Sequence, residues 1–322
     1  MLYPLQFDPI LKERVWGGNR LQRLFRKPAH PGQPIGESWE ISDRPEGVSV
    51  IKNGPLAGKD LRWLMQHHRD LLLGPHAAAH ARFPLLCKIL DADQKLSLQV
   101  HPPPAIAAQL GGEPKTEMWF IAQAEPGAEL YVGLRRGVTR ELFERKIADG
   151  TVADCFHRLP VQRGDVIFLP SGRVHALGAG LVIFEIQQNS DTTYRVFDWN
   201  RAGLDGKPRD LHVEQSLACI DFDDVEPVLI DAPWQMFQGM RRRPLVQSDL
   251  FRVDQVGLSP RSRLPIEGGQ MRVIATVEGV LLLASGSHSC QLGAGEFCLL
   301  PAAVPEAIVT NDAPATLLDI TL

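Results

Sequence analysis

Short apolar or alternating runs dominate the chain between residues 83 and 188, each bounded by glycine, proline or charged residues. Alternation with a period of two is typical of a strand with one buried face, and a short bounded apolar run is typical of a buried strand. The 28 glycines and 25 prolines also favour a turn-rich β architecture over a helical bundle. The pattern predicts six strands, with the sequences FPLLCKIL, KLSLQV, EMWFIAQA, AELYVGL, DVIFLP and LVIFEIQQ.

Two helices are predicted beside these strands. Apolar residues recur at helical spacing from residue 61 to residue 73, after Asp60 as a suitable N-cap and before Gly74 as a stop. A second helix is expected from about residue 139 to residue 148. His67 and His68 lie in the first helix and are expected to be surface or helix-packing residues, not metal ligands.

The last third of the chain repeats an earlier pattern. GAGEFCLLPAAVPEAIV at 293–309 aligns without a gap with QRGDVIFLPSGRVHALG at 162–178. The alignment keeps the strand-turn-strand order but places Glu306 opposite His175. We therefore expect a second copy of the same structural unit without the chemistry of the first.

Composition and charge narrow the class of protein. Hydrophobic residues make up 44% and charged residues 22% of the chain, as in soluble globular proteins. The net charge of −4 provides no general attraction to nucleic acid. The five cysteines have no CxxC spacing, which argues against a disulfide framework and a thiolate zinc site. No signal peptide and no membrane-spanning run is recognisable, so we expect a cytoplasmic protein.

Four residues form a candidate metal site. Gln99 and His101 are two apart in an apolar, β-prone run, so their side chains share one face of a strand. Glu117 follows, and His175 ends the segment GDVIFLPSGRVH. Neutral imidazoles, a carboxylate and an amide oxygen suit zinc or iron. Because the four lie on several strands, we expect a metal in the mouth of a small β-barrel.

The spacing of these residues resembles the two cupin motifs. GDVIFLPSGRVH at 164–175 has the spacing of the second motif, in which a tight Pro-Gly turn aims a histidine inward. QVH at 99–101, with Glu117 downstream, is similar to the first motif with Gln in place of its first His. Ala179 stands where the second motif often closes with Asn. The resemblance implies a mainly β fold, a cupin jelly-roll barrel with a few short helices.

The motifs and the repeat together predict that the chain forms two domains. Residues 1–222, with the helical segment near 60–74, are expected to form the catalytic cupin domain. Residues 223–322 are expected to form a second, degenerate cupin-like jelly-roll without a metal site, because no Gln-x-His pair precedes its strand-turn-strand unit. The acidic, proline-marked segment 221–235 is the expected junction.

Longer matches make the chain similar to one enzyme family, the type I mannose-6-phosphate isomerases in their short bacterial form. The matches run in family order from the N-terminus to about His212. Two departures are HPPP, where the family usually has an acidic residue after His-Pro, and the lack of a large helical insertion. The matching stretches are ERVWGGNRL, GESWEIS, PLLCKILDADQKLSLQVHP, KTEMWFI, GDVIFLPSGRVHALG and QQNSDTTYRVFDWNR followed by RDLH.

The resemblance implies a zinc-dependent aldose–ketose isomerase that interconverts mannose 6-phosphate and fructose 6-phosphate through an enediolate. One Zn²⁺ per chain is expected. The implied ligands are His101, Glu117 and His175, with Gln99 as the fourth. An amide is a weak ligand for zinc, so a water could stand in the place of Gln99.

The resemblance also implies the residues around the metal. Arg195 in SDTTYRV carries over as the active-site arginine, Lys88 and Lys115 as cavity lysines, and Glu185 as a cavity carboxylate. The chemistry agrees, because an enediolate needs a positioned base and preorganised positive charge. Lys115, Glu185 and a metal-bound water all remain candidates for the base.

Two residues near the N-terminus complete the expected site. Ser38 in GESWEIS and Trp16 in ERVWGG are expected to line the sugar pocket, with packing in the core as the alternative for each. The substrate is a phosphosugar, and neither nucleic acid nor membrane is expected as a partner. The sequence leaves a monomer and a homodimer equally open.

Two other functions compete with the isomerase. A cupin dioxygenase would use the same two histidines and carboxylate to hold iron. A non-catalytic sugar-binding cupin would keep the fold without turnover. Lys88, Lys115 and Arg195 favour a phosphosugar over the apolar substrate of an oxygenase. Oxygen consumption would separate the two enzymes.

Overall fold

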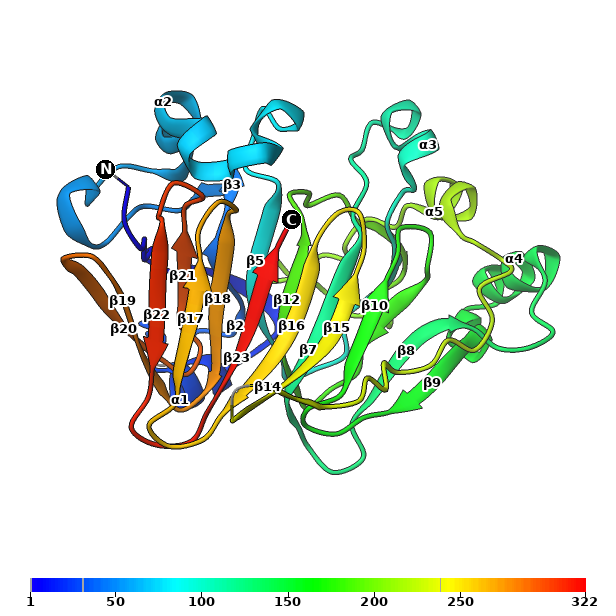
Figure 1. Cartoon of the computed structure of the whole chain (residues 1–322). Helices are drawn as coiled ribbons and strands as arrows, with labels where there is room; N and C mark the ends of the chain where they lie inside the picture. Colours follow the sequence, from blue (N-terminus) through cyan, green and yellow to red (C-terminus); the bar gives the residue numbers. More distant parts are fainter. Residues whose placement is uncertain (1, 31, 238) are drawn as a thin grey trace.

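The computed structural model describes residues 2–30, 32–237 and 239–322 and is mainly β, with a few short helices. Its strands form two jelly-roll barrels that lie side by side, each made of two sheets (Figure 1). The expectation of a mainly β fold with a second barrel is therefore confirmed. A short hairpin of β3 (Asp43–Arg44) and β4 (Gly47–Val48) stands apart from the four sheets.

The first barrel is built between residues 10 and 197. Its six-stranded sheet has the order β1-β2-β5-β12-β7-β10 and its five-stranded sheet the order β13-β6-β11-β8-β9. The strands are β1 (Ile10–Gly18), β2 (Ile35–Ile41), β5 (Leu85–Ala92), β6 (Leu98–Val100), β7 (Glu117–Ala124), β8 (Glu129–Leu134), β9 (Phe156–Pro160), β10 (Val166–Leu169), β11 (His175–Leu177), β12 (Leu181–Gln188) and β13 (Tyr194–Phe197). All six strands predicted from the sequence are present.

The second barrel repeats this order, except that its smaller sheet has four strands and no counterpart of β13. Its sheets run β14-β15-β16-β23-β18-β21 and β17-β22-β19-β20. The predicted repeat is confirmed, because β10 and β11 correspond to β21 and β22. The strands are β14 (Gln235–Phe237), β15 (Met240–Gln247), β16 (Arg252–Leu258), β17 (Arg263–Glu267), β18 (Arg272–Glu278), β19 (Val280–Ser285), β20 (His288–Gly293), β21 (Phe297–Leu300), β22 (Glu306–Thr310) and β23 (Ala315–Thr321).

The helices lie outside the barrels. Both predicted helices are present as α2 (Leu61–Leu73) and α4 (Arg140–Ala148). The Asp60 side chain accepts a hydrogen bond from the Trp63 amide, as an N-cap does. The others are α1 (Arg20–Phe25), α3 (Pro104–Ala107) and α5 (Val213–Cys219), with 3₁₀ turns η1 (Gly54–Leu56), η2 (Gly74–Ala79), η3 (Ala108–Leu110) and η4 (Val152–Cys155). None of these helices is long and apolar enough to cross a membrane.

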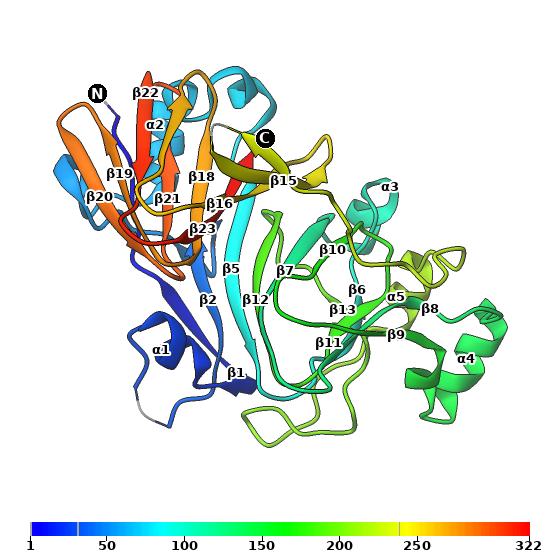
Figure 2. The ribbon, with the colours of Figure 1, turned by 60° about the horizontal axis from the view of Figure 1, so that its bottom comes forward.

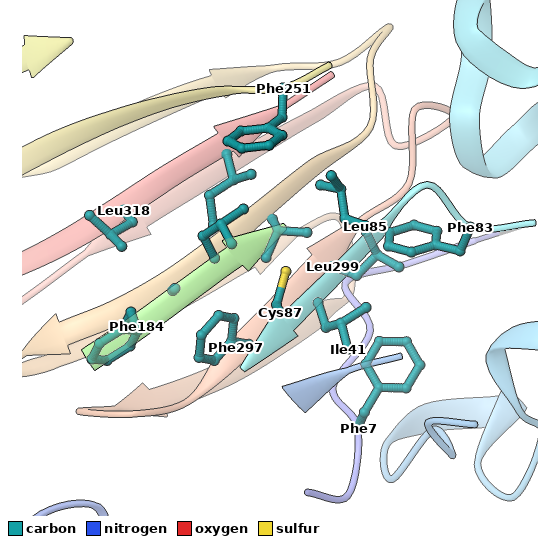
Figure 3. Packing of buried hydrophobic residues seen from close by; sticks show 14 of the residues in the cluster. Phe7, Ile41, Phe83, Leu85, Cys87, Phe184, Phe251, Phe297, Leu299 and Leu318 are labelled. Atoms are coloured by element: carbon teal, nitrogen blue, oxygen red, sulfur yellow. The ribbon is translucent and has the colours of Figure 1, made fainter. Parts of the chain in front are cut away.

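The largest hydrophobic core lies between the two barrels. Figure 2 shows the six-stranded sheet of the first barrel between its own five-stranded sheet and the second barrel. Cys87 and Phe184 point from β5 and β12 toward Phe297 and Leu318 of the second barrel (Figure 3). Side chains alternate along a strand, so Lys88 and its neighbours at every second position face the interior of the first barrel. The inter-barrel core therefore fixes which residues can reach a central cavity.

The segment 221–234 connects the barrels without strand structure of its own. It runs along the first barrel, where Val225 bridges Leu134 in parallel and the Ile230 amide donates to the Val166 carbonyl at 2.8 Å. The junction predicted from composition is thus an ordered segment on the surface of the barrel.

Candidate functional site

Three of the predicted metal ligands meet inside the first barrel. His101 follows β6, Glu117 begins β7 and His175 begins β11, and all three are buried. One potential ligand atom from each lies within 4.8 Å of the others. The Nε2 atoms of His175 and His101 lie 3.3 Å and 3.6 Å from the two carboxylate oxygens of Glu117. No other such group of three forms among residues 2–30, 32–237 and 239–322.

Backbone carbonyls orient both imidazoles. The Nδ1 of His101 lies 2.8 Å from the Thr192 carbonyl, and the Nδ1 of His175 lies 2.9 Å from the Arg173 carbonyl. A carbonyl only accepts, so each Nδ1 carries the proton and each Nε2 presents a lone pair toward Glu117. Outer contacts of this kind are typical of metal-binding histidines.

The electrostatics of these residues suit a divalent cation. Burial, reinforced by the charge of Lys115, lowers the pKa of His101 to about 3, which keeps the imidazole neutral at pH 7. Burial opposes the charge on Glu117, but Lys115 and the two histidines hold its pKa below the ordinary range. The Nε2 of His101 and both carboxylate oxygens of Glu117 are buried without a hydrogen-bond partner. A cation among them would satisfy all three atoms.

Gln99 adjoins the three residues. It pairs with His175 across β6 and β11, and its amide nitrogen lies 3.3 Å from His175 Nε2. A half-turn of the amide exchanges this nitrogen for the oxygen that a metal would need. Gln99 is half-buried, so a water can also reach this side of the group.

A cavity of about 230 Å³ opens beside the candidate metal ligands. Most of the residues predicted for the site line this cavity, namely Trp16, Lys88, Gln99, Lys115, Glu185 and Arg195. The sequence did not identify several others, which are Arg14, Glu37, Leu90, Leu96, Ser97, Trp119, Asp191, Thr193 and Arg209.

Ser38 is a wrong prediction. It pairs with Ile89 across β2 and β5, and both point away from the cavity. Its hydroxyl donates to Glu40 at 2.5 Å on the face toward the second barrel. The neighbouring Glu37 occupies the position expected for Ser38, because adjacent strand residues face opposite sides.

A buried ionic network crosses the cavity wall. The amine of Lys88 lies 3.3 Å from Glu185, 3.7 Å from Asp191 and 3.8 Å from Glu37. Burial opposes the charge on Lys88, but these carboxylates raise its pKa above the ordinary value, so the amine stays protonated. Burial and the charge of Glu117 raise the pKa of Glu185. Glu185 is therefore the cavity carboxylate most inclined to hold a proton.

Arg195 and Arg209 stand on the opposite side. Arg195 Nη1 donates to the Asp210 carbonyl at 2.7 Å, while its Nε is buried without a partner. Arg209 donates twice to Asp198, at 2.7 Å and 2.6 Å. Within the described part of the chain, Arg195 is the one cavity cation that forms no ion pair. Its charge is the one left for a ligand.

Two of the missed residues could have been predicted from strand alternation. Arg14 lies two positions before Trp16, so the two side chains share the cavity face of β1. Trp119 lies two positions after Glu117, and its indole nitrogen donates to Glu185 at 3.0 Å. By contrast, Arg209 reaches the cavity from a loop, where no repeating sequence pattern indicates which side chains point inward.

The buried carboxylate of Glu37 leads to a prediction about how the stability of the fold depends on pH. Burial opposes its ionisation, but Lys88 and Arg14 outweigh burial and lower its pKa to about 2. A depressed carboxyl pKa stabilises the fold above the unfolded value of 4.5, and this contribution declines as the pH falls toward 2. Glu37→Gln should therefore cost on the order of 3 kcal/mol at pH 7.

The test is chemical denaturation of both proteins in a chelator at several pH values. The free-energy gap between wild type and Glu37→Gln should narrow steadily between pH 5 and pH 3. A gap that stays constant over this range would show that the carboxylate charge of Glu37 contributes nothing.

The second barrel has a different cluster at the corresponding positions. By register, Arg272 takes the place of Glu117 and Glu306 that of His175, and Glu306 is exposed. Asp254 likewise takes the place of Lys88. Lys88 pairs with Glu185 of β12 in the first barrel, and Asp254 pairs with Asp319 of β23 in the second. Ion pairs link Arg242 to Asp254 and Arg272 to Asp319. The positions of Glu117, Lys88 and Glu185 are thus occupied by charged side chains that belong to one set of ion pairs.

Comparisons with known proteins agree with this geometry. Residues 4–117 match the family model of the phosphomannose isomerase type I catalytic domain. The chain is 36% identical to a mannose-6-phosphate isomerase of Streptococcus mutans over 94% of its length and 93% of that protein. It is also 36% identical to mannose-6-phosphate isomerase ManA of Bacillus subtilis, over 92% of this chain and 93% of that protein.

Solved structures give the same result for the fold. The crystal structure of a mannose 6-phosphate isomerase from Bacillus subtilis superposes with a TM-score of 0.90 at 30% identity, over 100% of both chains. A putative mannosephosphate isomerase from Archaeoglobus fulgidus has a TM-score of 0.78 at 24% identity, over 100% of this chain and 98% of that one. The second likeness concerns the fold alone.

Proposed function

Because the chain belongs to the type I phosphomannose isomerases and is a mannose-6-phosphate isomerase, we propose that it works with one zinc ion and through an enediolate. The proposed ligands are His101, Glu117 and His175, with Gln99 or water as the fourth. The substrate is mannose 6-phosphate or, in reverse, fructose 6-phosphate.

One observation carries the proposal. Three side chains whose chemistry suits zinc lie at the start of β7, at the start of β11 and directly after β6, and they leave buried ligand atoms without partners. Zinc favours nitrogen and carboxylate ligands and keeps an open position in catalytic sites. The cavity lined by Lys88, Lys115 and Arg195 also reaches Gln99, which adjoins the proposed zinc ligands.

The proposed chemistry divides among the residues of the cavity. Zinc, when bound, would supply a Lewis acid for the substrate oxygens. Arg195 supplies a charge that cannot be lost and that no carboxylate of the cavity already neutralises. A proton must move between two neighbouring substrate carbons, and Glu185 and Lys115 are the side chains proposed to hold it.

Lys88 and Trp16 are proposed to bind and orient the substrate. Lys88 holds Glu185 at 3.3 Å and reaches the cavity from β5. Trp16 supplies an apolar wall, and it is buried against the core of the barrel. Packing in the core is therefore compatible with the proposed role of Trp16 in the wall of the pocket.

A coupled assay tests the proposal. Protein stripped of metal by a chelator and then reloaded with zinc should convert mannose 6-phosphate to fructose 6-phosphate, and the stripped protein should not. Equal turnover in both samples would refute the role of zinc. Oxygen consumption with iron-loaded protein would instead favour the dioxygenase.

Three further properties are proposed, namely the location, the division into domains and the oligomeric state. The five cysteines are free thiols, which suits the reducing cytoplasm. We also propose that the second barrel, residues 223–322, holds no metal and packs against the catalytic domain, residues 1–222. The enzyme is proposed to be a monomer or a homodimer.

The second barrel gives a prediction of stoichiometry. Glu306 and its cross-strand partner Glu267 are both exposed, and Gly269 and Arg272 stand at the positions of His101 and Glu117. Two exposed carboxylates without an imidazole do not hold zinc tightly. Metal analysis should find one zinc per chain, and Glu306→Gln should keep near-normal activity. Two zinc ions per chain, one of them lost in Glu306→Gln, would contradict this expectation.

A further inference from the structure

The junction between the barrels is bonded to the turn 170–175, which presents His175 to the cavity. The amide of Asp221 donates to the Gly172 carbonyl at 3.0 Å. Residues 224–226 add a short parallel bridge to Leu134 at the end of β8, with bonds of 3.0 Å and 2.9 Å. The junction therefore packs against the outside of the turn as an additional layer.

One side-chain pair joins the two segments. The guanidinium of Arg173 donates to both carboxylate oxygens of Asp224, at 2.8 Å and 2.7 Å. Its third nitrogen donates to the Phe168 carbonyl at 2.7 Å, which closes the turn after β10. Both side chains are largely buried, with 17% and 15% of their surface exposed. A bidentate pair of this geometry has a fixed orientation, unlike most surface ion pairs.

The backbone of Arg173 continues this contact to the proposed zinc ligand. The Arg173 carbonyl accepts the Nδ1 proton of His175 at 2.9 Å. That bond fixes the tautomer in which His175 Nε2 faces Glu117, at 3.3 Å. The contacts thus run without interruption from Asp224 through Arg173 to His175.

We propose that Asp224 and Arg173 are positioning residues for His175, so that the inter-barrel junction helps to build the metal site. The inference rests on the proposed zinc site. Asp224 acts in two ways. It holds the turn that carries the orienting carbonyl, and it neutralises the Arg173 cation on the side away from the metal.

The affinity for zinc distinguishes positioning from simple stabilisation of the fold. Loss of an outer-layer partner of a zinc ligand typically weakens metal affinity by about 10- to 100-fold. We therefore expect Asp224→Asn to raise the Kd for zinc, measured by competition with a chromophoric chelator, by about that factor. Asp223→Asn is the matched control, because Asp223 is the exposed neighbour and should leave the Kd unchanged.

A double-mutant cycle tests the route through Arg173. Arg173→Met should weaken zinc binding as Asp224→Asn does, and adding Asp224→Asn to Arg173→Met should cause little further loss. Arg173→Lys keeps the charge but not the bidentate geometry, so it should show a smaller loss and covers the case in which Arg173→Met does not fold. The absorption spectrum of the cobalt-substituted protein should change in the same variants.

The outcomes separate the inference from the proposed function. A wild-type protein that binds no zinc tightly, or a His175→Ala variant that binds it normally, would refute the proposed zinc site itself. Tight binding by wild type, with the same Kd in Asp224→Asn, would overturn the inference alone. Additive losses in the double variant would show that Asp224 does not act through Arg173.

Discussion

His175→Ala is expected to abolish both tight zinc binding and isomerase turnover. The substitution removes one of the two neutral imidazoles of the proposed site and leaves Glu117 with a single nitrogen partner, so the remaining ligands cannot hold the ion in the same geometry. His101→Ala should have the same effect. Metal content of the purified protein and the coupled assay with mannose 6-phosphate measure the two losses.

His67→Ala is the control for this prediction. His67 is exposed on α2, stacks on Trp63 and lies outside the cavity, so its loss should change neither zinc content nor turnover. If His175→Ala retained a full complement of zinc and normal turnover, the assignment of the site would be wrong.

Arg195→Ala is expected to lower kcat/KM by about 10²- to 10³-fold while zinc content and Tm stay close to those of wild type. The expected loss is large because Arg195 is a cavity cation without an ion-pair partner, whose charge is proposed to act on the substrate and on the enediolate. Steady-state kinetics, zinc analysis and thermal unfolding of the same preparation measure the three quantities.

Arg195→Lys gives a sharper second measurement. A lysine keeps the positive charge but has no planar fork, so activity should recover only in part. Arg163→Ala, at an exposed position paired with Glu278, should be close to wild type in all three measurements. An Arg195→Ala protein that is unfolded or free of zinc would show that Arg195 is structural.

Periodicity and motif spacing identified the centre of the site because both are local properties of a strand. Alternation placed Gln99 and His101 on one face, and the Pro-Gly turn at 170–172 placed His175 opposite them. The six strands and two helices followed from the same kind of signal. These features depend on residues that are neighbours in the sequence.

The errors and omissions concern contacts between strands that are distant in the sequence. Ser38 was assigned to the cavity and Glu37 was missed, because the face of β2 is set by its pairing with β5 and not by its own composition. The ion pair between Lys88 and Glu185 depends on the register of β5 with β12. The contact of Asp224 with Arg173 depends on the path of an irregular segment, for which no sequence period exists.

The ion pairs of the second barrel restrict how this chain can diverge. Asp319 is buried between Arg272 and Arg242, and Asp254 pairs with Arg242 as well. Arg272 and Asp319 are the more buried pair, and replacing Arg272 alone would remove the nearer cation from the buried Asp319, which costs far more than exchanging both residues. Substitutions at these four positions should therefore accumulate in compensating pairs, so that related sequences show covariation there even though the residues bind no ligand.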